Sequence, residues 1–244
     1  MSYLVTQHLH KKFEGNSVLN DLSFQLEQHQ TLAILGKSGC GKTSLLKIIA
    51  GLLEADSGDI FLAEKNISTL SPQLRSAVYL YQEPLLFPHL NVFENIAFGL
   101  KIRQLDKKII EKEVKEMLAA LELEGFEKRM SEQLSGGQKQ RIAFARALII
   151  KPKLLLLDEP FGALDSETRA VMQTFFKKIS SEHKITSIFV THDLKEALQV
   201  GNTFALMDKG NLYCYDDKND FIKDEKTGVQ NEIEFWKTFE KNIE

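Results

Sequence analysis

One short segment constrains the fold more than any other part of this 244-residue chain. The apolar run Thr31–Leu35 predicts a short buried strand. It leads directly into a loop, residues 36–43, that holds three glycines, and residues 43–53 follow with the apolar spacing of a helix. A buried strand that turns through glycines into a helix is typical of α/β domains.

The loop has the pattern Gly36-x-x-x-x-Gly41-Lys42-Thr43 of a phosphate-binding P-loop. Glycines let backbone N–H groups turn toward phosphate oxygens, and the following helix start adds partial positive charge. We expect Lys42 to neutralise the β and γ oxygens of ATP and the Thr43 hydroxyl to bind Mg²⁺. An ordinary glycine-rich turn is the weaker alternative, because both flanking elements fit. The candidate ATP-binding residues here are Gly36, Lys37, Ser38, Gly39, Cys40, Gly41, Lys42, Thr43 and Ser44.

A second apolar strand, residues 153–157, ends in the acidic pair Asp158 and Glu159. Ligands of open α/β sheets bind at the carboxyl ends of such strands. We expect Asp158 to hold Mg²⁺ or its waters and Glu159 to polarise the attacking water as a general base. Taken alone, the acids could also be a surface cap of the strand; beside a P-loop that alternative weakens.

A second glycine-rich helix start follows Leu134, with the candidate ATP-binding residues Ser135, Gly136, Gly137 and Gln138. A serine cap followed by two glycines forms another phosphate-ready N-terminus. Because the first loop already encloses the phosphates, we expect this segment to face the nucleotide of a partner subunit. A helix cap without a ligand is the alternative.

Composition sets further limits. The formal net charge of −3 gives no overall basic field, so we expect no nucleic-acid partner. The two cysteines, Cys40 and Cys214, lack metal-ligand or redox spacing, which favours a reducing compartment. Residues 1–10 lack the layout of a signal peptide, and the apolar runs are too short to cross a bilayer. A role at a membrane would therefore require docking on another chain that spans it.

The arrangement of apolar residues predicts the order of elements. Segments 4–10 and 18–27 predict an antiparallel sheet, and Asp106 is expected to cap a helix over residues 106–123. Strands are also expected at residues 77–81 and 185–191, helices at 139–150, 166–182, 194–200 and 233–242, and hairpins at 57–67 and 203–215, the latter turning at Gly210-Asn211.

The expected fold class is α/β, a P-loop NTPase core with an antiparallel β subdomain and an inserted α-helical subdomain. The core is expected at about residues 1–85 and 151–215, and the helical subdomain at about 86–150. We expect the charged tail, residues 216–244, to be a loosely held, solvated end; a dimer contact and a partner-binding helix are the alternatives.

Over residues 3–215 these motifs, in this order, resemble the nucleotide-binding subunit of an ABC transporter, whose signature sequence is residues 134–138 as they stand here. The resemblance implies that Gln82 reaches Mg²⁺ and links the helical subdomain to the transmembrane partner. It also implies that Asp165, in the loop 162–165, lies at the dimer seam, and that His192 contacts the γ-phosphate. Phe13 matches the aromatic ring that stacks on adenine; a core role for Phe13, or Tyr3 in its place, is the alternative.

Residues 82–100 and 158–165 resemble bacterial importers for iron(III), polyamines and sulfate. The resemblance implies ATP and Mg²⁺ as cofactors and a head-to-tail ATP-sandwich dimer with a second copy or a paralogue. It implies transmembrane permease subunits as partners, a solute-binding protein acting indirectly, and a peripheral place on the cytoplasmic side of the inner membrane. Many such importers carry a C-terminal regulatory domain, which we do not expect in this chain.

Other ABC ATPases share these motifs. A soluble ATPase for iron–sulfur cluster assembly is the main alternative, although residues 87–89 favour the importer. Translation factors usually carry two cassettes and repair ATPases long coiled coils, so neither fits. A non-hydrolysing nucleotide sensor is disfavoured by the presence of Lys42, Asp158, Glu159 and His192.

Overall fold

The computed structural model describes residues 2–241, with side chains described through residue 235. The chain divides into two compact units. The first unit comprises residues 1–69 and 188–244, and the second comprises residues 70–187. The predicted limits of the helical subdomain, residues 86–150, stay a prediction.

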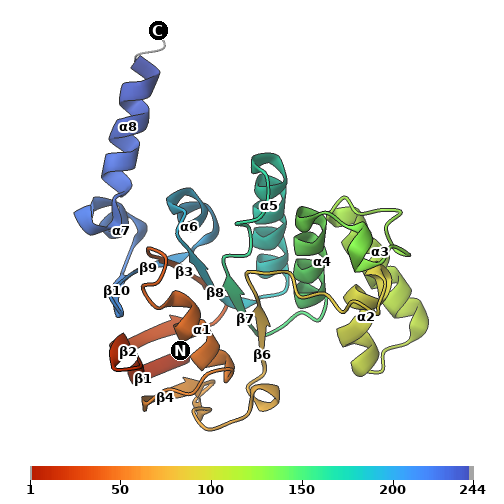
Figure 1. Ribbon diagram of the computed structural model, residues 1–244, viewed down its shortest axis with the longest axis horizontal. Coiled ribbons are helices and arrows are strands. Elements are labelled where there is room, and N and C mark those ends of the chain that lie inside the picture. Colours follow the sequence, from red (N-terminus) through yellow and green to blue (C-terminus); the bar gives the residue numbers. More distant parts are fainter. Residues whose placement is uncertain (1, 242–244) are drawn as a thin grey trace. The chain divides into compact units, whose positions relative to one another are not determined.

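An antiparallel sheet forms one part of the first unit, as the alternating segments predicted (Figure 1). Its strand order is β2-β1-β4-β5, with β1 at Ser2–Phe13, β2 at Asn16–Glu27, β4 at Ser57–Leu62 and β5 at Lys65–Asn66. The strands β1 and β2 follow each other directly through a tight turn, and β4 pairs antiparallel with both β1 and β5. The inward residues of β1 and β2, such as Leu4, Leu19 and Leu22, are fully or almost fully buried.

A second sheet of the first unit carries the glycine loop. The part of this sheet described with the first unit has the strand order β10-β9-β3-β8, with β3 at Thr31–Leu35, β8 at Thr186–Thr191, β9 at Thr203–Asp208 and β10 at Asn211–Tyr215. All five residues of β3 are buried, and β3 pairs parallel with β9. The helix α1, Lys42–Ala50, begins directly after the loop and ends three residues earlier than predicted, because Gly51 takes a left-handed φ of 77°.

The hairpin β9–β10 corrects one predicted turn. Asn211 pairs with Asp208, so the two turn residues are Lys209 and Gly210 rather than Gly210-Asn211. Both have positive φ, 47° and 80°, as a two-residue hairpin turn between twisted strands requires.

The charged tail was predicted to be a solvated end, and this prediction is wrong for its described first part. Helix α7, Lys218–Lys223, buries Phe221 completely, and the ring of Phe221 stacks on Phe204 with centroids 5.1 Å apart. A short turn over Glu225–Thr227 leads to helix α8, Val229–Lys241, which starts four residues before the predicted one and buries Val229. Aromatic burial therefore anchors the tail to the first unit; residues 242–244 lie outside the described part.

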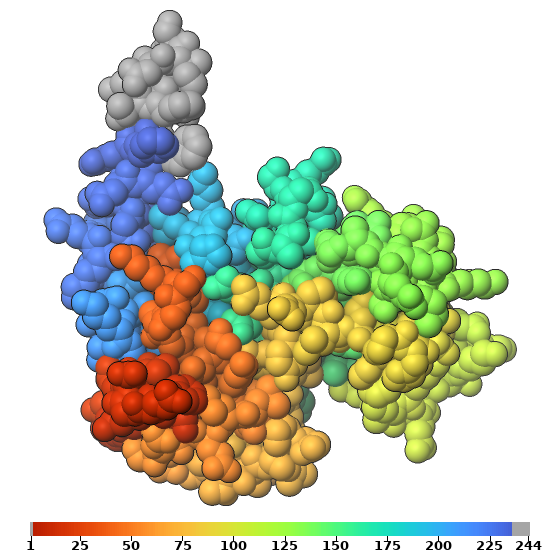
Figure 2. Space-filling model, in the orientation of Figure 1, coloured from red at the N-terminus to blue at the C-terminus, as the bar shows by residue number. Residues whose placement is uncertain are grey.

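The second unit combines one strand pair with four α-helices among the described residues. The strands β6, Ala77–Leu80, and β7, Leu154–Asp158, are parallel and in register, Tyr79 opposite Leu156. Its helices are α2 at Val92–Ile102, α3 at Lys107–Ala120, α4 at Gly136–Leu148 and α5 at Ser166–Glu182. Helix α2 packs against α3 and α4, and atoms of residues 90–150 gather into one lobe in the space-filling view, yellow to green (Figure 2).

Capping residues set where these helices begin. Asn91, Ser135 and Asp165 each accept a first-turn N–H at the starts of α2, α4 and α5, and Asp106 caps α3 as predicted. The α/β fold class is confirmed: parallel strand pairs and helices stand beside an antiparallel sheet. Among the described residues, no helix is both long and apolar enough to span a membrane.

Candidate nucleotide-binding site

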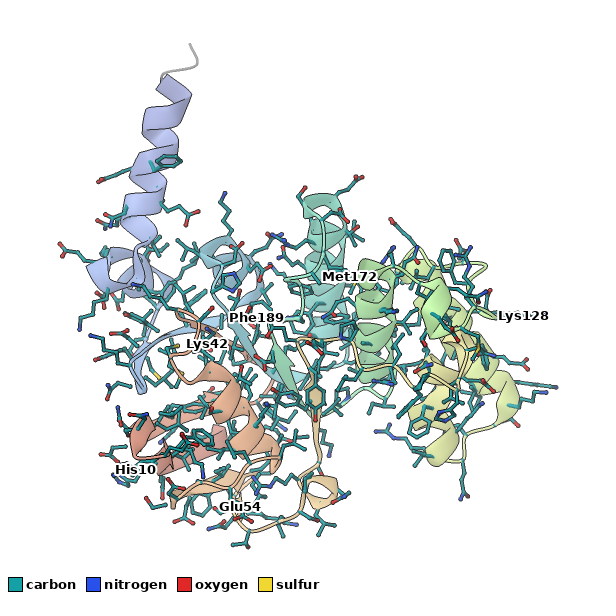
Figure 3. The ribbon with its side chains drawn as sticks, in the orientation of Figure 1. His10, Lys42, Glu54, Lys128, Met172 and Phe189 are labelled. Carbon is teal, nitrogen blue, oxygen red and sulfur yellow. The ribbon has the colours of Figure 1, made fainter. Side chains whose placement is uncertain are left out.

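The glycine loop wraps closely around its own lysine (Figure 3). Lys42 is 5% exposed, and its ammonium donates to the backbone oxygens of Gly36 at 2.7 Å and Lys37 at 3.0 Å. Gly41 precedes α1 with a φ of 113°, a conformation that residues with side chains rarely adopt. The loop therefore holds one positive charge at its centre, close to the backbone of its first residues.

His192 lies exposed at the end of β8, in the same unit as the loop. The Gly36 N–H donates to the oxygen of Thr191, the residue before His192. Asp193 caps α6, Leu194–Val200, and the Thr191 hydroxyl donates to the buried Glu196 at 2.8 Å, so the backbone beside His192 is fixed on both sides. A cavity of about 880 Å³ lies between these elements, lined by residues that include Gly36, Ser38, His192, Lys195 and Lys226.

The candidate adenine ring is Phe13, at the end of β1, with 44% of its surface exposed. The Lys11 ammonium lies 5.3 Å from its ring centroid and forms an ion pair with Asp56 at 2.8 Å. This hydrogen bond from Lys11 lowers the pKa of the Asp56 carboxyl. Tyr3, the alternative, is only 8% exposed, which favours Phe13 as the stacking ring.

The acidic pair of the second unit stands at the end of β7. Asp158 is 3% exposed, and Tyr79 on the neighbouring strand β6 donates its hydroxyl to Asp158 Oδ2 at 2.7 Å. Burial, together with the Asp158 charge, raises the pKa of Tyr79 far above its usual range, so this hydroxyl stays a proton donor. Glu159 follows with a φ of 44°, a left-handed conformation that is uncommon for a residue with a side chain. Strained residues of this kind are often found at functional sites.

The second glycine-rich start opens α4 with a capping box. The Ser135 hydroxyl accepts from the Gln138 N–H at 3.3 Å, while the Gln138 side chain accepts from the Ser135 N–H at 3.0 Å. Ser135 and Gly136 are exposed. One turn later the buried Gln140 donates to the oxygen of Pro160 at 2.8 Å, which ties α4 to the loop after Glu159.

The same loop ends at Asp165, which is exposed and caps α5. Its carboxylate accepts from the Thr168 N–H at 2.9 Å, and this bond lowers the pKa of the Asp165 carboxyl. The residue predicted to lie at a subunit seam is therefore a charged, exposed group at a helix start.

Gln82 is exposed and follows Tyr81, whose side chain lines an apolar groove of about 410 Å³. Arg146 of α4 lines this groove. Its guanidinium lies 4.6 Å from the Phe87 ring centroid and donates to the backbone oxygen of Leu85. Burial lowers the pKa of Arg146. The groove's exposed apolar side chains include Tyr81, Leu85, Phe98 and Ile102.

The predicted site residues fall into two sets. The first unit holds Phe13, the loop and His192, and the second holds Gln82, Asp158, Glu159, Asp165 and the segment 135–138. The sequence did not reveal the supporting residues Lys11, Tyr79, Gln140 and Arg146. Tyr79 is a polar aromatic residue in the predicted strand 77–81, but nothing in the sequence placed that strand beside Asp158.

Comparison with known proteins gives a consistent result. The family model described as ABC transporter matches residues 19–162. The chain is 48% identical over 202 residues to the spermidine/putrescine import ATP-binding protein PotA of Clostridioides difficile, covering 83% of this chain and 58% of that protein. It is 44% identical over 213 residues to the sulfate/thiosulfate import ATP-binding protein CysA of Halalkalibacterium halodurans, covering 86% of this chain and 60% of that protein.

The chain thus spans less than two thirds of the length of these curated relatives. Among solved structures, the ATP-binding cassette MJ0796, as a dimer in a post-hydrolysis state bound to ADP and Pi, superposes with a TM-score of 0.78 at 28% identity. The match covers 86% of this chain and 96% of that one. The chain therefore belongs to the ABC transporter family, whose ATP-binding domain it carries.

Proposed function

We propose that this chain is the ATP-binding, ATP-hydrolysing subunit of an ABC importer and works as a head-to-tail dimer. The observation that carries the proposal is the exposed start of α4. An exposed helix start with a serine and two glycines is suited to approach the nucleotide held by another copy. The solved structure of MJ0796, a dimer bound to ADP and Pi, supports dimerisation.

In this proposal each P-loop binds one ATP. Lys42 turns from the Gly36 and Lys37 oxygens toward the β and γ phosphates, and Phe13 stacks on adenine. Glu159 accepts a proton from the attacking water, His192 contacts the γ-phosphate, and Ser135 and Gly137 of a second copy complete the site. Asp165 lies at the seam between copies.

The residues proposed for Mg²⁺ are Thr43, Gln82 and Asp158. They offer a hydroxyl, an amide and a carboxylate oxygen, the hard donors that Mg²⁺ prefers, so the donor set fits the ion. The buried Asp158, with one oxygen already fixed by Tyr79, is the strongest of the three. When bound, Mg²⁺ would neutralise charge on the β and γ oxygens.

The apolar groove beside Gln82 is proposed to receive a short helix of a transmembrane permease subunit, a helix-in-groove contact. The exposed Leu85 and Ile102 would pack against that helix, and Gln82, the residue after Tyr81 of the groove, would link it to the metal site. The chain would then act peripherally at the inner membrane. A role in iron–sulfur cluster assembly is not favoured, because the curated relatives are import ATP-binding proteins.

The Glu159→Gln variant tests the proposal. It keeps the side-chain shape and removes the base, so we expect ATP binding to persist while turnover falls at least about 100-fold. We also expect an ATP-dependent dimer, seen as a doubling of mass by light scattering. Glu167→Gln, an exposed change in the first turn of α5, is the control and should turn over as the wild type does.

Turnover near the wild-type rate in Glu159→Gln would remove the general-base assignment. Failure to dimerise with ATP would remove the head-to-tail arrangement. Stimulation of the wild-type ATPase by a reconstituted importer permease, and its loss in Leu85→Glu, would separate transport from an assembly role.

A further inference from the structure

Tyr79 belongs to two features of the second unit at once. Its ring lines the apolar groove and lies 4.6 Å from the ring of Tyr81, at an interplanar angle of 61°. Its hydroxyl donates to Asp158 Oδ2 at 2.7 Å. One side chain therefore joins the groove surface to the carboxylate at the end of β7.

Strand register explains this placement. The strands β6 and β7 lie side by side (Figure 1), and in this parallel pair Tyr79 is opposite Leu156. Side chains two residues apart in a strand share a face, so Leu156 and Asp158 lie on one face, as do Tyr79 and Tyr81. The long tyrosine side chain reaches one step along the strand to Asp158, while Tyr81 extends the same face into the groove.

We propose that Tyr79 is a positioning residue that orients the Asp158 carboxylate for Mg²⁺ and makes that orientation sensitive to what occupies the groove. The inference rests on the proposed function, since it takes Asp158 as a metal ligand and the groove as the place where the permease helix docks.

The hydrogen bond restrains the orientation of the carboxylate. With Oδ2 accepting from Tyr79 at 2.7 Å, the plane of the Asp158 carboxylate cannot rotate without breaking that bond. Hydrogen bonds to a buried carboxylate are among the stronger ones, because the charge is poorly solvated. Partners that orient metal ligands typically change metal affinity about 10-fold or more when removed.

The groove end of the same side chain provides the coupling. Tyr81 is 37% exposed, so a helix that enters the groove would press on its ring and, through the edge contact, on Tyr79. A small shift of the Tyr79 ring moves its hydroxyl relative to Asp158. The groove and the metal site would thus be connected by one edge-to-face ring contact and one hydrogen bond.

The test is a Mg²⁺ titration of fluorescent ATP-analogue binding to the full chain, without a permease. In Tyr79→Phe, which keeps the ring, we expect the Mg²⁺ concentration for half-maximal binding to rise about 10-fold, while binding in EDTA stays unchanged. The matched control is Tyr215→Phe. It removes an equivalent hydrogen bond, from Tyr215 to Asp224 Oδ2, also 2.7 Å long, outside the site, and should leave the titration unchanged.

Binding in EDTA also corrects for any loss of folded protein, since it depends on the P-loop and not on Asp158. A Mg²⁺ midpoint within twofold of the wild type in Tyr79→Phe would overturn the positioning role. Absence of ATP binding in the wild type itself would instead overturn the proposed function.

A second titration addresses the coupling. Tyr81→Ala removes the ring that contacts Tyr79. This change is expected to shift the Mg²⁺ midpoint several-fold in the wild-type background and not at all in the Tyr79→Phe background. Equal shifts in both backgrounds would show that Tyr81 acts independently of Tyr79 and would overturn the coupling.

Discussion

The helices α1 and α4 both begin with glycine-rich segments, and they differ in how their first backbone N–H groups are capped. Helix α1 begins after Gly41, which has no side chain with which to cap the helix and stands at a φ of 113°. Helix α4 begins after Ser135, which forms a reciprocal capping box with Gln138. The start of α1 has no side-chain cap, whereas the start of α4 has a capping box within its own chain for the N–H groups of Ser135 and Gln138.

The glycines differ in the same way. A Cβ at Gly36 would lie 2.5 Å from the Met207 oxygen, and one at Gly41 would lie 2.7 Å from the Val18 oxygen. A Cβ at Gly136 would meet nothing within 4 Å, and one at Gly137 only the Leu164 side chain at 3.5 Å. The loop therefore needs its glycines in order to fold, whereas α4 has room for side chains at its start. We infer that the open space at α4 serves the approach of a partner copy and its nucleotide.

The largest expected effect is on ATP affinity and concerns Lys42, at the start of α1. Lys42→Ala removes the buried ammonium that would exchange the Gly36 and Lys37 oxygens for phosphate oxygens. Charge-assisted hydrogen bonds contribute about 1.5–3 kcal/mol each, so loss of two should weaken ATP binding at least about 100-fold. Calorimetric titration of ATP into the variant measures this.

Lys47→Ala is the control, because Lys47 lies in the last turn of α1, away from the loop. ATP affinity of Lys42→Ala within tenfold of the control would mean that the uncapped start, and not the lysine, provides most of the binding.

The next largest effect is on the free energy of unfolding and concerns Gly41 and Gly136. Gly41→Ala places a side chain at positive φ and against the Val18 oxygen, so we expect the free energy of unfolding to fall by about 2 kcal/mol or more. Gly136→Ala should raise it by about 0.4–1 kcal/mol, because alanine favours the helix and meets open space. Urea unfolding of both variants measures the difference. Equal destabilisation by the two would contradict the contrast between the helix starts.

The capping serine gives a smaller effect, separable from stability. Ser135→Ala should cost about 1 kcal/mol of stability and leave ATP binding by the single chain intact. If Ser135 also completes the site of another copy, ATP turnover should fall about 10-fold. The comparison is Asn91→Ala, which removes an equivalent capping box at α2 in the same unit.

Turnover per ATP-bound chain distinguishes the two roles. An equal loss of turnover in Ser135→Ala and Asn91→Ala would mean that Ser135 acts only as a cap.

The sequence predicted most of the helices and strands that position the starts of α1 and α4. The bounds of β3, α5 and α6 agree with the predicted ones to the residue, because buried runs and clear caps delimit them. The turn at Lys209-Gly210 was misplaced by one residue, since either adjacent pair supplies the required glycine. The tail was misjudged because one ring among its charged residues, Phe221, packs on Phe204 and Tyr215 of the hairpin β9–β10, and the sequence pattern does not indicate these contacts.

The candidate site shows a similar limit. Residues in contiguous motifs, such as the loop and the segment 135–138, could be proposed from spacing alone. The pair Tyr79–Asp158 depends on strand register, and the pair Gln140–Pro160 on how α4 packs. Both join segments 20 or more residues apart, and one-dimensional spacing carries no sign of such contacts.

The smallest expected effect concerns the alkylation rate of Cys40, which lies in the glycine loop before α1. Burial raises the pKa of the Cys40 thiol, with the Lys42 charge opposing the shift only in part. A raised thiol pKa means that little thiolate is present at pH 7, so alkylation should be slow there and accelerate as the pH rises toward that pKa. ATP at about three times its Kd should slow alkylation about fourfold, because only the unoccupied loop reacts. Mass spectrometry of iodoacetamide-treated Cys214→Ser isolates the Cys40 rate. If ATP binds and leaves that rate unchanged, the loop around Cys40 does not close on the phosphates. The start of α1 would then be as open as the start of α4, contrary to our proposal.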